Sequence, residues 1–194
     1  MTSEELKNFV LFPDTSKKWS YTDVVNWGED VHVEILNGEL FLSPTPTFYH
    51  QTVSLNLVIL MSNFIKKFKL GKIVTAPQDT RLGNFNLVQP DILFISNQNT
   101  KVRIDKTVIG PPDLVVEIIS PSSVSRDYHK KKDIYEKFKV QEYWIVDPGN
   151  QSVEVLYLVD DKYEILSLGD SLDKKVFSKV LAGFEVTLAE IFEE

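Results

Sequence analysis

The sequence has no cysteine and no long hydrophobic run. Without cysteine it can form no disulfide bond, no thiolate nucleophile and no zinc site built from cysteine ligands. No apolar stretch is long enough to span a bilayer, so we expect no membrane association. The first ten residues are acidic and lack the basic-then-apolar order of a secretion signal, which predicts a cytoplasmic protein.

Basic side chains are outnumbered: 21 Lys and Arg stand against 28 Asp and Glu, for a net charge of −7. This balance excludes a generally basic nucleic-acid-binding surface. The charge is uneven, because residues 150–194 carry a local net charge of −6 and residues 126–139 a local net charge of +3. An acidic protein with one basic helix can still bind a polyanion locally, although a solvated helix face is the simpler explanation of that run.

The remaining composition is that of a soluble globular protein. The 194 residues are 43% hydrophobic, and 12 Phe, 7 Tyr and 3 Trp can fill a sizeable core. Hydrophobic periodicity, caps and turn residues predict the following elements: helices at 20–27, 50–68, 125–139 and 188–192, hairpins at 31–43 and 152–168, and strands at 72–76, 79–82, 91–96, 113–120 and 140–147. This order predicts an α/β or α+β sheet protein with helices packed on the sheet.

Two acids occupy positions where acids are costly. Asp91 opens the apolar run 92–95, and Glu117 lies inside the apolar strand 113–120. A carboxylate in a buried strand needs a partner, because its desolvation alone costs several kcal/mol. For one such acid a salt bridge or a wet sheet edge is the better explanation. Two acids on neighbouring strands favour a shared metal ion.

One lysine of the 125–139 helix is equally out of place. Tyr128, Lys131, Tyr135 and Phe138 are three, four and three residues apart, so they share one helix face that is otherwise aromatic. Lys131 either snorkels outward, pairs with a carboxylate, or directs its ammonium into a pocket with Asp91 and Glu117. We favour the last, with Lys131 rather than its two lysine neighbours as the functional residue.

Two carboxylates and one lysine suit phosphodiester hydrolysis. Carboxylate oxygens suit Mg²⁺, which polarises a phosphate and lowers the pKa of a bound water. Lys131 would orient or deprotonate that water, or neutralise the transition state, and Arg126 could contact a flanking phosphate. Glu34 and Glu39 flank the first hairpin turn, where acids are more often solvated than functional. His50, at a helix start, could approach a substrate or only cap its helix.

Several segments stand in a characteristic order and spacing along the chain. They are EILNGEL (34–40) followed by Ser-Pro and by His50-Gln51, APQDTRL (76–82), QPDILFI (89–95), GPPDLVVEIISPSS (110–123), RD (126–127) with Lys131 and Tyr135, and EYWIVDP (142–148). Together these segments resemble the Uma-two family of restriction-endonuclease-like proteins, and the resemblance covers about residues 20–168.

The resemblance implies the PD-(D/E)XK nuclease fold, a mixed central sheet flanked by helices, with N- and C-terminal hairpin additions. It implies one domain over 1–194, with a core at about 46–148, a helix and hairpin at 20–43, and a hairpin and tail at 150–194. It also implies a DNA phosphodiesterase site that uses Mg²⁺ or Mn²⁺. The residues that match this site are Asp91 and Glu117 as metal ligands, Lys131 as the catalytic lysine, and Glu39, His50, Arg126 and Tyr135 as accessory residues.

The sequence departs from the wider pattern at Ile119, where the lysine of E-x-K would stand. The family's usual alternative is a lysine on the following helix, here Lys131. The departure therefore leaves two hypotheses: a metal-dependent DNA endonuclease, and a catalytically inactive binding module in which Lys131 and Glu117 form only a salt bridge. A metal-dependent hydrolase of smaller phosphoesters is a third. Many nucleases of this fold are dimers, and the 152–168 hairpin is a candidate dimer edge.

Overall fold

The computed structural model describes residues 16–27, 31–42, 45–120 and 126–193. Helical segments are α2 (Tyr21–Val24), α3 (Phe48–Phe68), the π-helical η1 (Arg126–Lys131), α4 (Lys132–Lys137) and α5 (Leu188–Phe192). The central sheet has β3 (Gly71–Thr75), β6 (Ile92–Ser96), β9 (Leu114–Ile118), β10 (Glu142–Asp147), β11 (Ser152–Val159) and β12 (Lys162–Gly169). A second sheet has β1 (Val33–Leu36), β2 (Glu39–Leu42), β4 (Thr80–Gly83), β5 (Asn86–Val88), β7 (Arg103–Ile104) and β8 (Val108–Ile109), and β13 (Lys175–Phe177) pairs with β14 (Glu185–Thr187).

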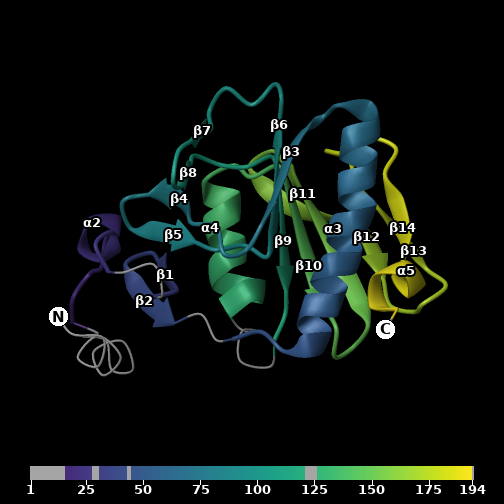
Figure 1. Ribbon diagram of the computed structural model, residues 1–194, viewed down its shortest axis with the longest axis horizontal. Helices are drawn as coiled ribbons and strands as arrows, with labels where there is room; N and C mark the ends of the chain where they lie inside the picture. The colour runs from purple at the N-terminus through teal and green to yellow at the C-terminus, as the bar shows by residue number, and fades with distance from the viewer. Residues whose placement is uncertain (1–15, 28–30, 43–44, 121–125, 194) are drawn as a thin grey trace.

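The central sheet is mixed, as predicted, with the strand order β12-β11-β10-β9-β6-β3. Only β9 and β10 run parallel, and η1 and α4 make the crossover between them. The other neighbouring pairs are antiparallel. Both β9 and β10 are almost entirely buried, because helices cover the two faces of the sheet at this point (Figure 1).

Alternation along β9 divides the core into two layers. Val116 and Ile118 pack with α3 and the C-terminal segment on one face, whereas Val115 packs with α4 on the other. Glu117 has the same parity as Val115, so its side chain belongs to the α4 face. The sheet thus fixes the side on which the acid must find its partner.

The N-terminal hairpin belongs to the second sheet, where β1 pairs with β5. Asn37 and Gly38 both have positive φ angles, 52° and 92°, as an Asn-Gly hairpin turn requires. Helix α2 has Ser20 as its N-cap, and Ser20 forms a capping box with Asp23. Val33 and Ile35 pack toward Trp19 and α2, so the next side chain, Glu34, points to the opposite face of β1.

Several expectations need correction. Strands β5, β7 and β8 were not predicted, because they are only two or three residues long. Helix α3 begins at Phe48, two residues before the predicted start, and its last residue, Phe68, is 52% exposed. The 125–139 helix begins as a π-helix, and the 152–168 hairpin forms two strands of the central sheet. The last residue of the predicted 31–43 hairpin and the first residue of the predicted 125–139 helix lie outside the described residues.

Candidate active site

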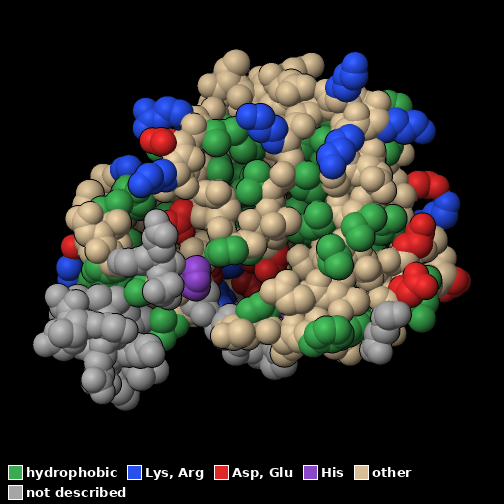
Figure 2. Space-filling model, in the orientation of Figure 1, with side chains coloured by type: hydrophobic (Ala, Val, Ile, Leu, Met, Phe, Trp, Pro, Cys, Tyr) green, Lys and Arg blue, Asp and Glu red, His purple; other side chains and the backbone are tan. Residues whose placement is uncertain are grey.

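Strand register brings the two predicted acids together. Ile92 pairs with Val116 in the antiparallel β6–β9 ladder, so Asp91, one residue before β6, lies beside the end of β9 that carries Glu117 and Ile118. Asp91 Oδ2 accepts a hydrogen bond from the Ile118 backbone N–H at 2.7 Å. Figure 2 shows acidic and basic side chains set back in a hollow between the part of the molecule that carries β1 and β2 and the lower end of α3.

Lys131 comes to Glu117 from the crossover helix. Its Nζ donates to Glu117 Oε2 at 2.8 Å, and both side chains are 4% exposed. Asp127, one turn earlier, places Oδ1 3.6 Å from the same nitrogen. Ile119, where E-x-K would have its lysine, is buried in the apolar cluster on the α4 face. The structure therefore brings the helix lysine, and not a strand residue, to the acid.

Glu34 is a member of this cluster that the sequence reasoning placed in solvent. Its side chain is 4% exposed, and Oε1 lies 2.8 Å from Lys131 Nζ. The same oxygen accepts the Gln89 backbone N–H at 2.9 Å. A signal was present, because Glu34 lies within an apolar strand as Glu117 does. The expectation was correct for Glu39, whose side chain is 63% exposed.

These two acids of one hairpin make a matched pair for a stability measurement. We expect Glu34→Ala to lower the free energy of unfolding by about 2–4 kcal/mol, because it leaves a buried ammonium and a backbone N–H short of an acceptor. Glu39→Ala removes only an exposed pair with Lys130 and should cost at most about 1 kcal/mol. Urea unfolding of both variants measures the difference. Equal losses would mean that the Glu34 contacts add nothing.

Tyr135 provides the second hydrogen bond to the Glu117 carboxylate, beside that from Lys131. Its hydroxyl donates to Glu117 Oε1 at 2.5 Å from a fully buried position on α4. Burial, and then the charge of Glu117, raises the pKa of Tyr135 well above its ordinary value. Tyr135 therefore remains a hydrogen-bond donor at any pH at which the protein works. Of the four residues predicted as accessory, it has the most direct contact with the central acid.

Burial and charge act in opposite senses on the central ion pair. Desolvation raises the pKa of Glu117 well above its ordinary value; Lys131 opposes this, while Asp127 and Glu34 reinforce it. Desolvation by itself would lower the pKa of Lys131, but the surrounding carboxylates, Glu117 first, outweigh it and raise that pKa. The Lys131 ammonium therefore holds its proton more firmly than a free lysine does, which suits it to neutralising charge.

His50 reaches the site from the other face of the sheet. It lies in the first turn of α3, which begins at the N-cap Thr47. Its Nε2 lies 2.9 Å from the Ile118 carbonyl oxygen and 3.5 Å from Asp91 Oδ2. Burial lowers the pKa of His50, but the hydrogen bond and the charge of Asp91 outweigh it, and the pKa is raised. His50 thus contacts the metal-ligand candidate Asp91 rather than only capping its helix.

The other two accessory candidates, Glu39 and Arg126, gather elsewhere. Glu39 pairs with Lys130, and the Lys130 ammonium lies 5.0 Å from the ring centre of Phe41. The Arg126 guanidinium lies 5.6 Å from the same ring centre. Together they form a partly exposed, basic-and-aromatic rim on β2 and η1, beside the acid cluster rather than in it. Such a rim can contact a phosphate backbone.

The donor set is chemically compatible with a divalent cation. Among the described residues, no group of three or more His, Asp or Glu side chains is arranged to hold a metal ion. Mg²⁺, however, often takes only one or two carboxylates and completes its shell with water and phosphate oxygens. Asp91 and Glu117 supply two such carboxylates. Three carboxyl groups, those of Glu34, Glu117 and Asp127, surround the single ammonium of Lys131.

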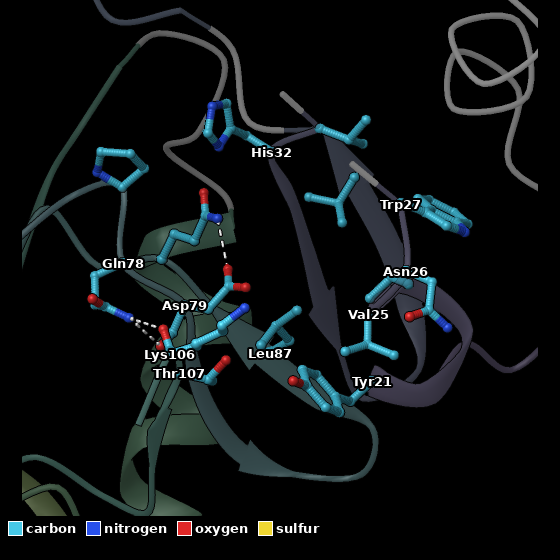
Figure 3. A pocket seen from close by; sticks show the side chains of 15 residues that line it. Tyr21, Val25, Asn26, Trp27, His32, Gln78, Asp79, Leu87, Lys106 and Thr107 are labelled. Atoms are coloured by element: carbon cyan, nitrogen blue, oxygen red, sulfur yellow. Dashed lines mark hydrogen bonds between the residues drawn. The ribbon is translucent and has the colours of Figure 1, made fainter. Parts of the chain in front are cut away.

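A separate pocket of about 580 Å³ lies beyond β1, on the face opposite Glu34 (Figure 3). Its walls include Tyr21, Val33, Leu87 and His32, and none of Asp91, Glu117 and Lys131 lines it. Two of its polar side chains are engaged by other lining residues: Gln89 Nε2 donates to Asp79 Oδ1 at 2.7 Å, and Gln78 Nε2 donates to the Lys106 carbonyl at 3.1 Å. The acid cluster therefore remains the better candidate for chemistry.

Comparison with known proteins adds three findings. A search of curated proteins found no match. The solved structure of a protein described as a putative nuclease belonging to DUF820, from Anabaena variabilis ATCC 29413, superposes with a TM-score of 0.74 at 19% identity, over 89% of this chain and 97% of that one. At that identity the likeness shows a shared fold. The model of the Uma2 family, described as "Putative restriction endonuclease", matches residues 21–189. The chain therefore belongs to the Uma2 family, and its restriction-endonuclease-like fold, predicted from the sequence, is confirmed.

Proposed function

We propose that the protein is a divalent-metal-dependent DNA endonuclease, with Asp91 and Glu117 as the metal ligands and Lys131 as the charge-stabilising residue. Membership of a family described as restriction endonucleases supports nuclease function at the general level. The observation that carries the finer proposal is that a second acid, Asp91, is hydrogen-bonded to β9 at Ile118, next to the buried Lys131–Glu117 contact of 2.8 Å. Buried acids with a strongly raised pKa beside a specific charged partner are typical of functional sites.

In this proposal some residues position the Glu117 carboxylate and the Lys131 ammonium, and Lys131 also stabilises charge on the phosphate. A Mg²⁺ or Mn²⁺ ion bound by Asp91 and Glu117 would polarise the phosphate and activate a water. Tyr135 and Lys131 fix the Glu117 carboxylate by hydrogen bonds to its two oxygens. The Lys131 ammonium remains charged and offsets negative charge that develops on the phosphate. Glu34 holds that ammonium in place from the second sheet.

Plasmid cleavage at low salt tests the proposal. We expect nicking of supercoiled DNA in Mg²⁺ or Mn²⁺ and none after EDTA. Low salt matters because an acidic protein that binds DNA through few basic residues loses affinity steeply as salt rises. After EDTA is removed, the protein should regain cleavage activity when Mg²⁺ is added back. Cleavage that persists in EDTA would overturn the metal dependence.

The inactive binding module is the second candidate, since it predicts the same Lys131–Glu117 ion pair. The pair alone does not separate the two functions, but metal affinity does. Calorimetric titration with Mn²⁺ should give binding that is lost in Asp91→Asn and in Glu117→Gln. Absence of metal binding by the folded wild type, together with absence of cleavage, would favour the binding module. Replacing the plasmid in the cleavage assay with a small phosphodiester tests the third hypothesis, a metal-dependent hydrolase of smaller phosphoesters.

A further inference from the structure

Helix α3 presents an uncharged face away from the central sheet. Its first 18 residues, 48–65, contain no Asp, Glu, Lys or Arg. Phe48, Leu55 and Ile59 are 90%, 58% and 50% exposed, and their spacing of seven and four residues aligns them in one stripe. Figure 2 shows apolar side chains in this region of the molecule. A long surface helix with an apolar stripe and no charge is typical of an interaction surface.

Opposite charges flank the two ends of this stripe. Lys66 lies seven residues after Ile59, so it continues the stripe at the C-terminal end of α3, and it is exposed. Helix α5 lies against the N-terminal half, where Asn56 Nδ2 donates to the Glu193 carbonyl at 2.8 Å. Glu190 and Glu193 of α5 are exposed there. Figure 1 shows α5 beside the lower half of α3 and the helix's C-terminal end at the top.

We propose that the α3 face, defined as Phe48, Leu55, Ile59 and Lys66 with the α5 acids beside it, binds the same face of a second copy of this chain. In a two-fold arrangement with the α3 helices antiparallel, the Lys66 end of each copy lies over the α5 end of the other. The apolar stripes then meet without desolvating a charge, and the basic and acidic ends attract one another across the interface. The surface is thus complementary to itself in this one orientation.

The charge pattern distinguishes this occupant from other partners. A nucleic acid backbone would gain nothing from a charge-free stripe bordered by acids. The predicted dimer edge, β12, is the outermost strand of the central sheet and carries the exposed apolar residues Ile165 and Leu168. It also carries the exposed Lys162 and Glu164, and charged side chains of this kind protect an edge strand from pairing. The α3 face is therefore the better dimer surface.

Sedimentation of the full chain tests the interface. We expect wild type to form a dimer at micromolar concentration. The double variant Leu55→Lys/Ile59→Lys should raise the dimer dissociation constant by roughly a hundredfold or more, because it buries unpaired charge on both copies. Ile165→Lys/Leu168→Lys, with comparable exposure on β12, is the matched control and should leave the dimer intact. Circular dichroism should show an unchanged fold in both.

Charge reversal tests the orientation. Lys66→Glu should raise the dissociation constant by about tenfold, and adding Glu193→Lys to the same chain should restore the dimer. A wild type that is monomeric at every concentration overturns the proposal, as does a dimer that only the β12 variant dissociates. Failure of Glu193→Lys to restore the Lys66→Glu dimer overturns the antiparallel arrangement. None of these outcomes depends on nuclease activity.

Discussion

Replacing Glu117 with glutamine is expected to abolish metal-dependent cleavage, with a loss of about a thousandfold or more. Glutamine keeps the shape of the side chain and an acceptor for Tyr135, but it removes the charge that a metal ion needs. The expected result is loss of nicking and of Mn²⁺ binding together, measured by plasmid cleavage and calorimetry. Asp91→Asn should behave alike, because Asp91 is the second proposed metal ligand and is hydrogen-bonded to β9 at Ile118, next to Glu117.

Glu117→Gln should remain folded, and the pH dependence of its free energy of unfolding provides the control. Between the ordinary pKa of 4.5 and the raised pKa of Glu117, the folded protein holds a proton that the unfolded chain has lost. The free energy of unfolding therefore falls as pH rises through this window. Glu117→Gln should remove that fall when unfolding is measured in EDTA. A glutamine variant that still cuts DNA at the wild-type rate would show that Glu117 is not a metal ligand.

Replacing Lys131 with methionine is expected to have the largest effect on stability. Methionine fills the space of the lysine stem, but it leaves Glu34, Glu117 and Asp127 without their shared cation. Removing one partner from such a buried charge cluster costs about 3–5 kcal/mol. We expect this loss at neutral pH in urea unfolding, and loss of cleavage under conditions in which the variant is folded. Lys130→Met, on the exposed side of the same turn, should be nearly neutral.

A double variant separates the structural role of Lys131 from its catalytic role. If the cost of Lys131→Met comes from stranded negative charge, then Lys131→Met/Glu117→Gln should be more stable than Lys131→Met alone. Cleavage should not return in the double variant. A single variant Lys131→Met that is as stable as wild type would contradict the buried ion-pair description. A Lys131→Met variant that is folded and fully active would instead show that Lys131 is not the charge-stabilising residue.

Much of the secondary structure could be predicted because its signals are local. The Asn-Gly hairpin, the apolar strands around Glu117 and the periodicity of α3 each depend on residues that are close in sequence. The short strands β7 and β8 could not be predicted, because two residues carry no periodicity. Nor could the π-helical start of the crossover helix, since the aromatic spacing from Tyr128 to Phe138 fits an α-helix equally well.

The candidate site was predictable at positions where a charged residue stands in an apolar sequence pattern. Asp91, Glu117 and Lys131 each stand in or beside an apolar pattern, and the structure pairs Lys131 with Glu117 and hydrogen-bonds Asp91 to the next residue of β9, Ile118. Their catalytic roles remain a prediction. Glu34 was missed because its place beside a turn suggested solvent, although its strand is fully buried. His50 was left undecided, because nothing local shows that a helix start will meet Asp91.

The sequence by itself determined the fold class and the identity of the acids and the lysine that are costly to bury, because burial of a charge is a property of the local apolar pattern. Only the tertiary structure decided which of those charges meet. Glu34 and Lys131 are 97 positions apart in the chain, and they lie 2.8 Å apart because β1 of the second sheet packs against the crossover helix. Long-range packing sets such distances, and no local pattern encodes them.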